Sequence, residues 1–417
     1  MTIRRPAARL AGMLLVSGLL FVTACSGSGA DNGATPSSAP PQSGTTTSLP
    51  PASPPPDLAD RGAIVEQQPF EGNDQLADVG RLIQVVYRST AAYAGGFGTE
   101  VSGVVAVPAG DPPAGGWPIV ALGHGTTGTS VTCGPSDYPD LLGEDGNVAR
   151  LVARGYVVAA SDYQGLGTSV EHPRPHPYLE PNTVAYNMID AVRAARNVVP
   201  EASDRWAAMG ASQGGQAAWA AAEHADDYGQ GLDFVGAAAL APAADLSPIT
   251  DAGLDVKYTD AQKIFIPNLV AGLREVHPDL DPDDYMRGGL AAGAPAFTSC
   301  GPTSTGDKFS AAMDIAPGDA AIADQAAVDR LREILESDAL PAEPAAGPLF
   351  VAYGDQDTII LSAWTTAALQ RACAQGDVIE IVRKPAGGHT NLGVTGDAVD
   401  WISDRFAGEP APDTCPN

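Results

Sequence analysis

The sequence predicts an α/β fold, in which a mostly parallel sheet carries helices on both of its faces. Two observations lead to this prediction. The first apolar segments of the chain alternate with the period of two that strands have, and the later strand-like segments alternate with segments of helical period. The part able to fold, from about residue 60 to 417, is long enough for one large domain with an insertion or for two domains.

The predicted elements follow from short apolar runs and from the segments between them. The predicted strands are residues 81–90, 99–108, 117–123, 156–162, 205–212, 232–241, 347–354 and 378–384. The predicted helices are residues 140–155, 181–199, 216–225, 361–373 and about 394–406. The first two strands pair with each other, and helices separate most of the others. The Ala-rich stretch 205–209 fits a helix as well as a strand.

The helix predicted over 181–199 has the clearest signals. Pro181 is favourable at the first helical position, where its missing N–H is no loss. One helical face then carries Val184, Met188, Ile189, Val192 and Ala195. That apolar face is expected to pack on the sheet.

About 100 residues between the strands that end near Ala241 and begin near Gly347 have no strand pattern. Two amphipathic helical patterns lie in this segment: Ile266, Leu269, Val270, Leu273 and Val276, and then Val328, Leu331, Ile334 and Leu335. An insertion at this point covers the carboxyl ends of the strands, where ligands bind in α/β sheets. We therefore predict a packed helical cap, or lid, over residues 247–345, and a core domain made of residues 61–246 and 346–417.

The N-terminal residues 1–24 have the pattern of an export signal peptide. A basic start without acids precedes an apolar run of about 13 residues and then small residues. This run is shorter than the roughly 20 residues that a membrane span requires. The tetrad 22–25 resembles a bacterial lipobox, which predicts lipidation of Cys25; the alternative is an ordinary secreted protein with an incidental cysteine.

Residues 25–60 are rich in Pro, Ser and Thr and have almost no apolar side chains, which predicts a disordered linker behind the lipid anchor. The expected location is therefore extracytoplasmic, either as a bacterial cell-membrane lipoprotein or as a secreted protein. The formal net charge of −27 argues against nucleic acid or anionic lipid as the main partner.

The remaining cysteines fit an oxidising compartment. Cys133, Cys300, Cys373 and Cys415 are even in number, which predicts two disulfides among three possible pairings. No metal site is expected. The acidic run 279–284 lacks the Gly and Glu that a calcium loop requires. In the segment 172–176, HPRPH, two prolines prevent the helix that would align its histidines.

One serine stands between two glycines in the sequence GASQGG. Gly210, Ser212 and Gly214 fit the pattern Gly-x-Ser-x-Gly, which is typical of a nucleophile elbow. In such an elbow a strand turns sharply into a helix, and the crowded backbone requires positions almost free of side chain on either side. Since Ser212 lies between a predicted strand and a predicted helix, we predict that it is a nucleophile.

A nucleophilic serine requires a base, and the base requires an acid that orients it. Where the chain order is serine, acid, histidine, the base is His389, because no other histidine follows residue 355. Asp355 and Asp357 both follow a predicted strand. The spacing of three residues from Gly354 favours Asp357 as the acid, and Asp355 is the alternative.

The developing oxyanion of such a reaction requires hydrogen-bond donors. The backbone amide of Gln213, directly after the serine, is the first predicted donor. The second is expected in the loop 123–128, GHGTTG, where the amide of Thr126 is favoured and that of Thr127 is the alternative. His124 in this loop is expected to shape it rather than to act as the base.

Five motifs in this order, LGHGTTG, GYVVAASDYQGLG, GASQGGQAA, YGDQDTII and GGHTN, resemble the secretory lipase family, that is, the fungal lipase A type and its actinobacterial lipoprotein relatives. The resemblance covers residues 65–410. It implies an α/β-hydrolase fold with a helical cap, Ser-Asp-His catalysis on carboxylic esters, and no cofactor. It also implies that Cys133 pairs with Cys300 and Cys373 with Cys415.

The expected function is that of an exported serine hydrolase, a lipase or carboxylesterase that cleaves acyl esters of lipids through an acyl-enzyme. Its partners are then the ester substrate and, through the lipid anchor, the membrane. Two alternatives remain open at this point. A serine peptidase uses the same catalytic groups on the same fold, and a surface binding protein could keep the fold without catalysis.

Overall fold

The computed structural model describes residues 53–171, 173–255, 257–300 and 305–416. The predicted signal peptide, the lipidation site Cys25 and most of the predicted linker lie outside the described residues. Within them, no helix combines the length and the apolar character that a membrane span requires.

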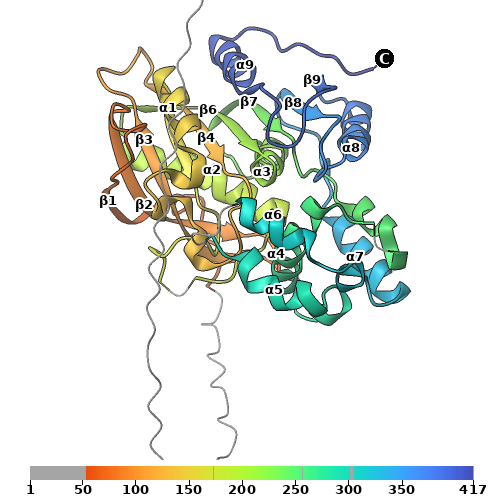
Figure 1. The fold of residues 1–417 in the computed structure, drawn as a ribbon. Coiled ribbons are helices and arrows are strands. Elements are labelled where there is room, and N and C mark those ends of the chain that lie inside the picture. The colour runs from red at the N-terminus through yellow and green to blue at the C-terminus, as the bar shows by residue number, and fades with distance from the viewer. Residues whose placement is uncertain (1–52, 172, 256, 301–304, 417) are drawn as a thin grey trace, which may run out of the picture. The chain divides into compact units, whose positions relative to one another are not determined.

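In the described part of the chain, nine strands form one sheet with the order β1-β2-β3-β5-β4-β6-β7-β8-β9 (Figure 1). β1, β2, β3 and β5 pair antiparallel, and the strands from β5 to β9 pair parallel. Their bounds are β1 (Ile64–Pro69), β2 (Arg81–Ala91), β3 (Phe97–Val107), β4 (Trp117–Gly123), β5 (Val157–Ser161), β6 (Ala202–Ala211), β7 (Asp233–Leu240), β8 (Leu349–Gly354) and β9 (Ile379–Lys384).

The predicted strands agree with these elements, and the ambiguous stretch 205–209 belongs to β6. The sequence prediction missed β1. This strand lies at the edge of the sheet, and all of its residues except Ile64 are exposed. An exposed edge strand buries neither face, so it lacks the apolar alternation by which the other strands are recognised.

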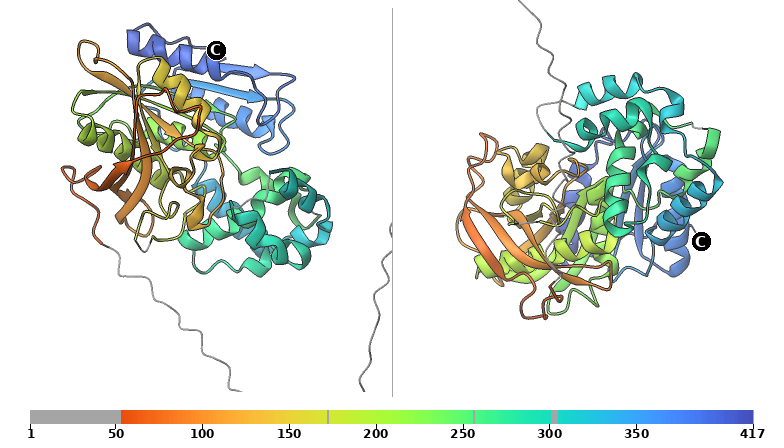
Figure 2. Two further views of the ribbon diagram at one scale, coloured as in Figure 1. Left: turned by 60° about the vertical axis from the view of Figure 1, so that its left-hand side comes forward. Right: turned by 90° about the horizontal axis from the view of Figure 1, so that it is seen from below.

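Helices cover both faces of the sheet (Figure 2). α1 (Asp145–Ala153) and α9 (Thr395–Ala407) pack on one face, where they share a hydrophobic core with the strands. α2 (Pro181–Val198), α3 (Gln213–Glu223) and α8 (Ser362–Gln375) contribute to the core of the other face. Both layers therefore hold the central strands, whose carboxyl ends carry the site described below.

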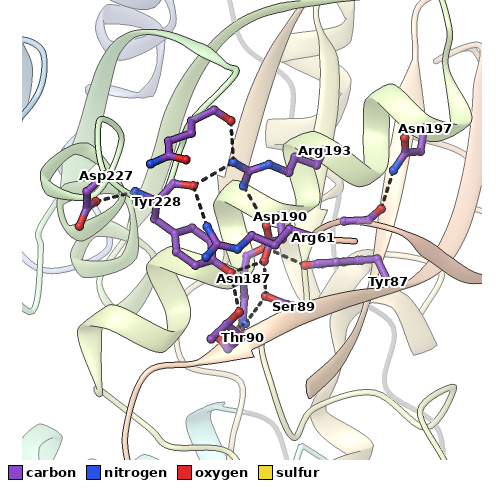
Figure 3. A network of polar contacts seen from close by, with 12 residues as sticks. Arg61, Tyr87, Ser89, Thr90, Asn187, Asp190, Arg193, Asn197, Asp227 and Tyr228 are labelled. Atoms are coloured by element: carbon purple, nitrogen blue, oxygen red, sulfur yellow. Dashed lines mark hydrogen bonds and ion pairs between the residues drawn. The ribbon is translucent and has the colours of Figure 1, made fainter. Parts of the chain in front are cut away.

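A buried polar network joins α2 to β2 (Figure 3). Asp190 accepts hydrogen bonds from Ser89 Oγ at 2.8 Å and from the Tyr228 hydroxyl at 2.7 Å, and it forms an ion pair with Arg193 at 2.9 Å. Asn187 donates a further bond to Ser89 at 2.9 Å. Burial raises the pKa of Asp190 to about 6, and the surrounding donors oppose that increase. Because every member has partners, the network fixes the position of α2 on the sheet.

Between β7 and β8 the described chain consists of helices and the loops that connect them. These helices lie together in Figure 1 and in the two views of Figure 2. They share a hydrophobic core of their own. The elements are η4 (Ser247–Asp255), α4 (Asp260–Val276), η5 (Pro282–Asp284), α5 (Gly288–Thr298), α6 (Thr305–Met313), η6 (Pro317–Ala320) and α7 (Gln325–Ser337). We call residues 247–345 the helical segment.

The two amphipathic patterns of the sequence correspond to α4 and α7, whereas α5 and α6 were not predicted. The sequence of α5, GGLAAGAPAFT, consists mostly of Gly, Ala and Pro and buries only Leu290 and Phe297. Gly and Pro are poor helix formers, and two buried side chains are too few to produce a helical period.

Two disulfides link segments that are far apart in the sequence. Cys133, in the short helix η1 (Val131–Cys133) after β4, pairs with Cys300 directly after α5. Cys373 on α8 pairs with Cys415 near the C-terminus. These are the pairs that the family resemblance implied. The first of them ties the helical segment to the sheet domain.

Candidate active site

Ser212 lies at the sharp turn between β6 and α3. Its backbone angles are φ 58° and ψ −116°, a conformation that residues other than glycine rarely adopt. Its N–H donates to the carbonyl of Leu240 at 2.8 Å, and its own carbonyl accepts from the N–H of Gln216 at 3.0 Å. The strained backbone is therefore held by β7 on one side and by the first turn of α3 on the other.

The glycines around Ser212 are required by the close approach of three backbone segments. A β-carbon on Gly210 would overlap the carbonyl of Gly214, and one on Gly214 would overlap the carbonyl of Gly123 at the end of β4. Any larger residue would push β4 and β6 away from the start of α3. The elbow pattern thus has a direct steric cause in this chain.

Loops from the ends of β8 and β9 bring an acid and a histidine to Ser212. The hydroxyl oxygen of Ser212 lies 2.9 Å from His389 Nε2. On the other side of the ring, His389 Nδ1 lies 2.7 Å from Asp357 Oδ2. With the proton on Nδ1, the imidazole donates to the carboxylate and accepts from the serine hydroxyl. The three side chains therefore form a continuous hydrogen-bonded chain.

The two candidate acids have different partners. Asp357 is buried, and its Oδ1 accepts from the backbone N–H groups of Ile359 at 2.8 Å and Ile360 at 2.9 Å. Asp355 instead accepts from Arg383 Nε at 2.7 Å and is neutralised by that ion pair. The structure therefore brings Asp357, and not Asp355, to His389.

Gln213 begins α3, so its N–H is one of the first-turn donors without a partner inside the helix. Its side-chain amide donates to His176 Nε2 at 2.7 Å, and His176 Nδ1 donates to the carbonyl of Gln164 at 2.8 Å. Burial lowers the pKa of His176 to about 3, so the ring stays neutral and accepts from Gln213. No local pattern in the sequence indicates that His176 supports Gln213, because the contact joins residues 37 positions apart.

The loop after β4 lies beside Ser212. A β-carbon added to Gly125 would be 3.9 Å from the β-carbon of Ser212. The hydroxyl of Thr126 is 2.6 Å from the hydroxyl of Tyr178, whereas Thr127 donates its hydroxyl to the carbonyl of Cys133 at 2.8 Å. Thr126 is thus held by Tyr178, whereas Thr127 is held by the last residue of η1.

His124 in the same loop is buried. Among the described residues, it forms no hydrogen bond with Ser212. Its ring nitrogens lie 2.6 Å from the carbonyl of Gly125 and 3.1 Å from that of Asp162, and the ring stacks on Tyr163 at 4.3 Å. Burial lowers the pKa of His124. These contacts fix the path of the loop, and they leave His389 as the histidine at the nucleophile.

An apolar pocket of about 30 Å³ opens at Ser212, which is room for about two water molecules. Ile266 and Leu269, two of the predicted cap residues, line it from α4. Val270 lines a smaller neighbouring cavity, and Leu273 lines neither. The other lining residues are Tyr178, Leu179, Ala243, Leu246, Ile249, Gln262, Phe265, Ile359 and Ile360.

Elsewhere in the described residues, no group of three or more His, Cys, Asp and Glu side chains could hold a metal ion. The acidic run 279–284 ends in the short helix η5 (Pro282–Asp284), whose N-cap Asp281 accepts from the N–H of Asp283 at 3.0 Å. His172 of the segment HPRPH lies outside the described residues.

The family model of the secretory lipases matches residues 143–414. Many solved structures are similar to the chain, among them a lipase, an esterase and a putative hydrolase. Lipase A from Candida antarctica is 18% identical over 87% of this chain and 86% of its own, with a TM-score of 0.67. The rice cell wall degrading esterase LipA from Xanthomonas oryzae is 19% identical over 83% and 96%, with a TM-score of 0.62.

A putative hydrolase from Legionella pneumophila is 20% identical over 79% of this chain and 90% of its own, with a TM-score of 0.58. Identities this low establish the shared α/β-hydrolase fold and nothing finer. A search of curated protein sequences found no significant match.

Proposed function

The chain belongs to the secretory lipase family and is a carboxylic ester hydrolase, and we propose that it cleaves acyl esters of lipids through a covalent acyl-enzyme on Ser212. One observation carries the proposal. Ser212, which is linked through His389 to Asp357 with spacings of 2.9 Å and 2.7 Å, lines an apolar pocket. A nucleophile with its base and its orienting acid thus adjoins a surface suited to an acyl chain.

In the proposed first half-reaction, Ser212 Oγ attacks the ester carbonyl carbon while His389 Nε2 takes the hydroxyl proton. The carbonyl oxygen becomes an oxyanion, which the amides of Gln213 and Thr126 stabilise. The carbon–oxygen bond to the leaving alcohol then breaks, and His389 gives that alcohol its proton. Asp357 keeps the imidazole in the required tautomer and stabilises its positive charge.

In the second half-reaction, water takes the place of the alcohol. His389 removes a proton from the water as its oxygen attacks the acyl carbon, and a second oxyanion forms in the same position. When this intermediate collapses, Ser212 Oγ leaves and recovers its proton from His389. The products are a carboxylic acid and the free enzyme.

We further propose that the helical segment is the cap of this enzyme and that its side chains contact the acyl chain. The pocket wall on α4 is apolar at Phe265, Ile266 and Leu269. A cavity of about 30 Å³ is much smaller than a long acyl chain, so binding of such a chain requires these side chains or α4 to move. The net charge of −27 favours uncharged lipid esters over anionic ones.

A substrate panel tests the proposal. It contains p-nitrophenyl esters from acetate to palmitate, triacylglycerols and aminoacyl amides, with the Ser212→Ala variant as the control for background hydrolysis. We expect turnover of the esters and triacylglycerols. Faster cleavage of the amides would make the protein a peptidase. The absence of turnover, together with no labelling by a fluorophosphonate, would make it a binding protein.

Membership of the secretory lipase family and the two disulfides indicate an extracellular or secreted protein. We propose in addition that residues 1–24 are removed as a signal peptide, that Cys25 is lipidated and that the segment after it is a linker. Cys25→Ser should abolish incorporation of a metabolic fatty-acid label and release the protein from the membrane fraction. A label that persists on this variant would contradict the lipid anchor.

A further inference from the structure

We propose that Thr259 and Gln262, at the start of α4, are positioning residues for the catalytic acid Asp357. The cap would then help to organise the reacting groups in addition to lining the pocket. This inference rests on the proposed function, because it assumes that Asp357 orients His389 during ester hydrolysis.

The two residues first form a capping box within their own helix. Thr259 Oγ1 accepts from the N–H of Gln262 at 3.0 Å, and Gln262 Oε1 accepts from the N–H of Thr259 at 3.1 Å. These bonds satisfy donors at the helix N-terminus, as in any capping box. They leave the hydroxyl proton of Thr259 and the amide protons of Gln262 available for other partners.

Both side chains donate these protons to the loop that carries the acid. The Thr259 hydroxyl donates to the carbonyl of Thr358 at 2.6 Å, and Gln262 Nε2 donates to the carbonyl of Ile359 at 3.0 Å. The start of α4 is therefore bonded twice to the two residues that follow Asp357.

The two carbonyls belong to the peptide groups that hold Asp357. The carbonyl of Thr358 shares a peptide group with the N–H of Ile359, and the carbonyl of Ile359 shares one with the N–H of Ile360. Both N–H groups donate to Asp357 Oδ1, at 2.8 Å and 2.9 Å. In a trans peptide the carbonyl and the N–H point in opposite directions. Each peptide group thus lies between a donor on the cap and the carboxylate.

This arrangement fixes the orientation of the two N–H groups that bond to Asp357, and it strengthens their bonds. A bond at the carbonyl end fixes the rotation of the peptide plane, and it also polarises the amide so that its N–H becomes a better donor. Gln262 and Asp357 are each 5% exposed, so water has little access to replace the bond from Gln262, whereas the bond from Thr259 to the carbonyl of Thr358 is exposed. Without the cap donors, the two N–H groups would hold the carboxylate less firmly toward His389.

The opposite end of α4 is held independently. Glu275 accepts from the Tyr93 hydroxyl at 2.7 Å, and a β-carbon on Gly272 would overlap the backbone of Tyr178, so the helix packs tightly there. Loss of the bonds at Thr259 should therefore leave α4 in place. This separation allows the positioning role to be tested without unfolding the cap.

The primary variant is Thr259→Val, which keeps the shape of the side chain and removes the donor; Thr259 does not line the pocket. Thr259→Ser restores the hydroxyl, and Gln262→Met removes the second donor. The matched control is Asp324→Ala, because Asp324 caps α7 by accepting from the N–H of Ala327 at 2.9 Å, without a hydrogen bond to the acid loop. Each variant is made alone and combined with Asp357→Asn.

We measure kcat and KM for p-nitrophenyl butyrate, with active sites counted by a fluorophosphonate. Gln262→Met should lower kcat roughly 3- to 10-fold, as expected for one lost hydrogen bond, and its KM can change as well because Gln262 lines the pocket. Thr259→Val should lower kcat about 3-fold, because its bond is exposed, with KM changed less than about twofold. Thr259→Ser should retain most of the activity, and Asp324→Ala should leave kcat per active site unchanged. In the Asp357→Asn background, Thr259→Val should cause no further loss, because its effect passes through the carboxylate.

Equal losses from Thr259→Val in both backgrounds would overturn the inference, since the residue would then act independently of Asp357. Wild-type activity of Thr259→Val beside a crippled Asp357→Asn would also overturn it, while leaving the proposed function intact. If Asp357→Asn itself were as active as the wild type, the proposed triad would fail first.

Discussion

The carboxyl edge of the sheet and the helical segment that we propose as the cap both contribute to the pocket at Ser212, and they differ in how tightly the chain is constrained. At the sheet edge, the backbones around Gly123, Gly210 and Gly214 are so close that a single β-carbon does not fit. The helical segment contributes apolar side chains to the pocket, among them Ile266 and Leu269 on α4, where a change in side-chain size is less restricted than at those glycines. We propose a division of roles in which the sheet edge holds the reacting groups, and the pocket-lining side chains of α4 select which acyl chain reaches them.

The largest effect should come from the sheet edge. Ser212→Ala should lower kcat by about 10⁶-fold and leave the fold intact, because the nucleophile and its base act as a unit. The measurement is turnover of a p-nitrophenyl ester, with circular dichroism as the control for folding. Retention of more than about a thousandth of the activity would contradict the role of Ser212.

The two aspartates of the acid loop should differ strongly. Asp357→Asn should lower kcat by about 10⁴-fold, because the imidazole loses its orienting charge. Asp355→Asn removes only the ion pair with the half-exposed Arg383, so its effect should be small. A crippling effect of Asp355→Asn together with a mild effect of Asp357→Asn would reverse the assignment.

Changes at the pocket-lining residues of α4 should alter selectivity rather than the reaction. Ile266→Phe and Leu269→Phe should depress turnover of long acyl esters relative to acetate by about 10- to 200-fold, the range expected for steric changes in an apolar pocket. Leu273→Phe is the matched control, since Leu273 is buried on the same helix and lines neither cavity.

The measurement for these variants is the ratio of kcat/KM across the chain-length series, together with the melting temperature. A lower melting temperature with equal losses for all esters is expected of Leu273→Phe. The same result for Ile266→Phe and Leu269→Phe would reduce the cap to a packing element.

The smallest effect is expected where the chain returns from the cap to the sheet. Glu223 at the end of α3 accepts from the N–H groups of Ala342 and Glu343, both at 3.1 Å, and burial raises its pKa from 4.5 to about 8. Between these values the folded protein binds a proton at Glu223 that the unfolded chain has released. The free energy of unfolding therefore falls as the pH rises from about 4.5 to 8.

Glu223→Gln keeps an acceptor for the two N–H groups and removes this titration. Its melting temperature should fall less than that of the wild type as the pH increases through this interval. Identical slopes for the two proteins would show that Glu223 does not contribute to the pH dependence of stability.

The same division explains what the sequence could predict. The nucleophile, its glycines and the central strands follow from local patterns, because each depends on residues close together in the chain. The choice of Asp357 followed from spacing to Gly354, and the structure adds its physical basis in the N–H groups of Ile359 and Ile360. The spacing to Gly354 therefore identified the acid, whereas the reason why this position holds the acid is visible only in the structure.

The missed features depend on contacts between distant residues. His176 supports Gln213 from a loop 37 residues earlier, and Thr259 reaches a carbonyl 99 residues later. Their residue types carry no signal of these partners. The sequence prediction missed β1 and α5 for a different reason. They bury too few side chains to produce a strand-like or helix-like period of apolar residues.

The most direct test of the central claim is to locate the covalent adduct of a fluorophosphonate by peptide mass spectrometry. The account predicts one adduct, on the peptide that contains Ser212, and its loss in Ser212→Ala. It also predicts that Leu269→Phe still forms the adduct, because Leu269 lines the pocket and a small probe does not need that part of it. An adduct on another serine, or no adduct on correctly folded protein, would contradict the account.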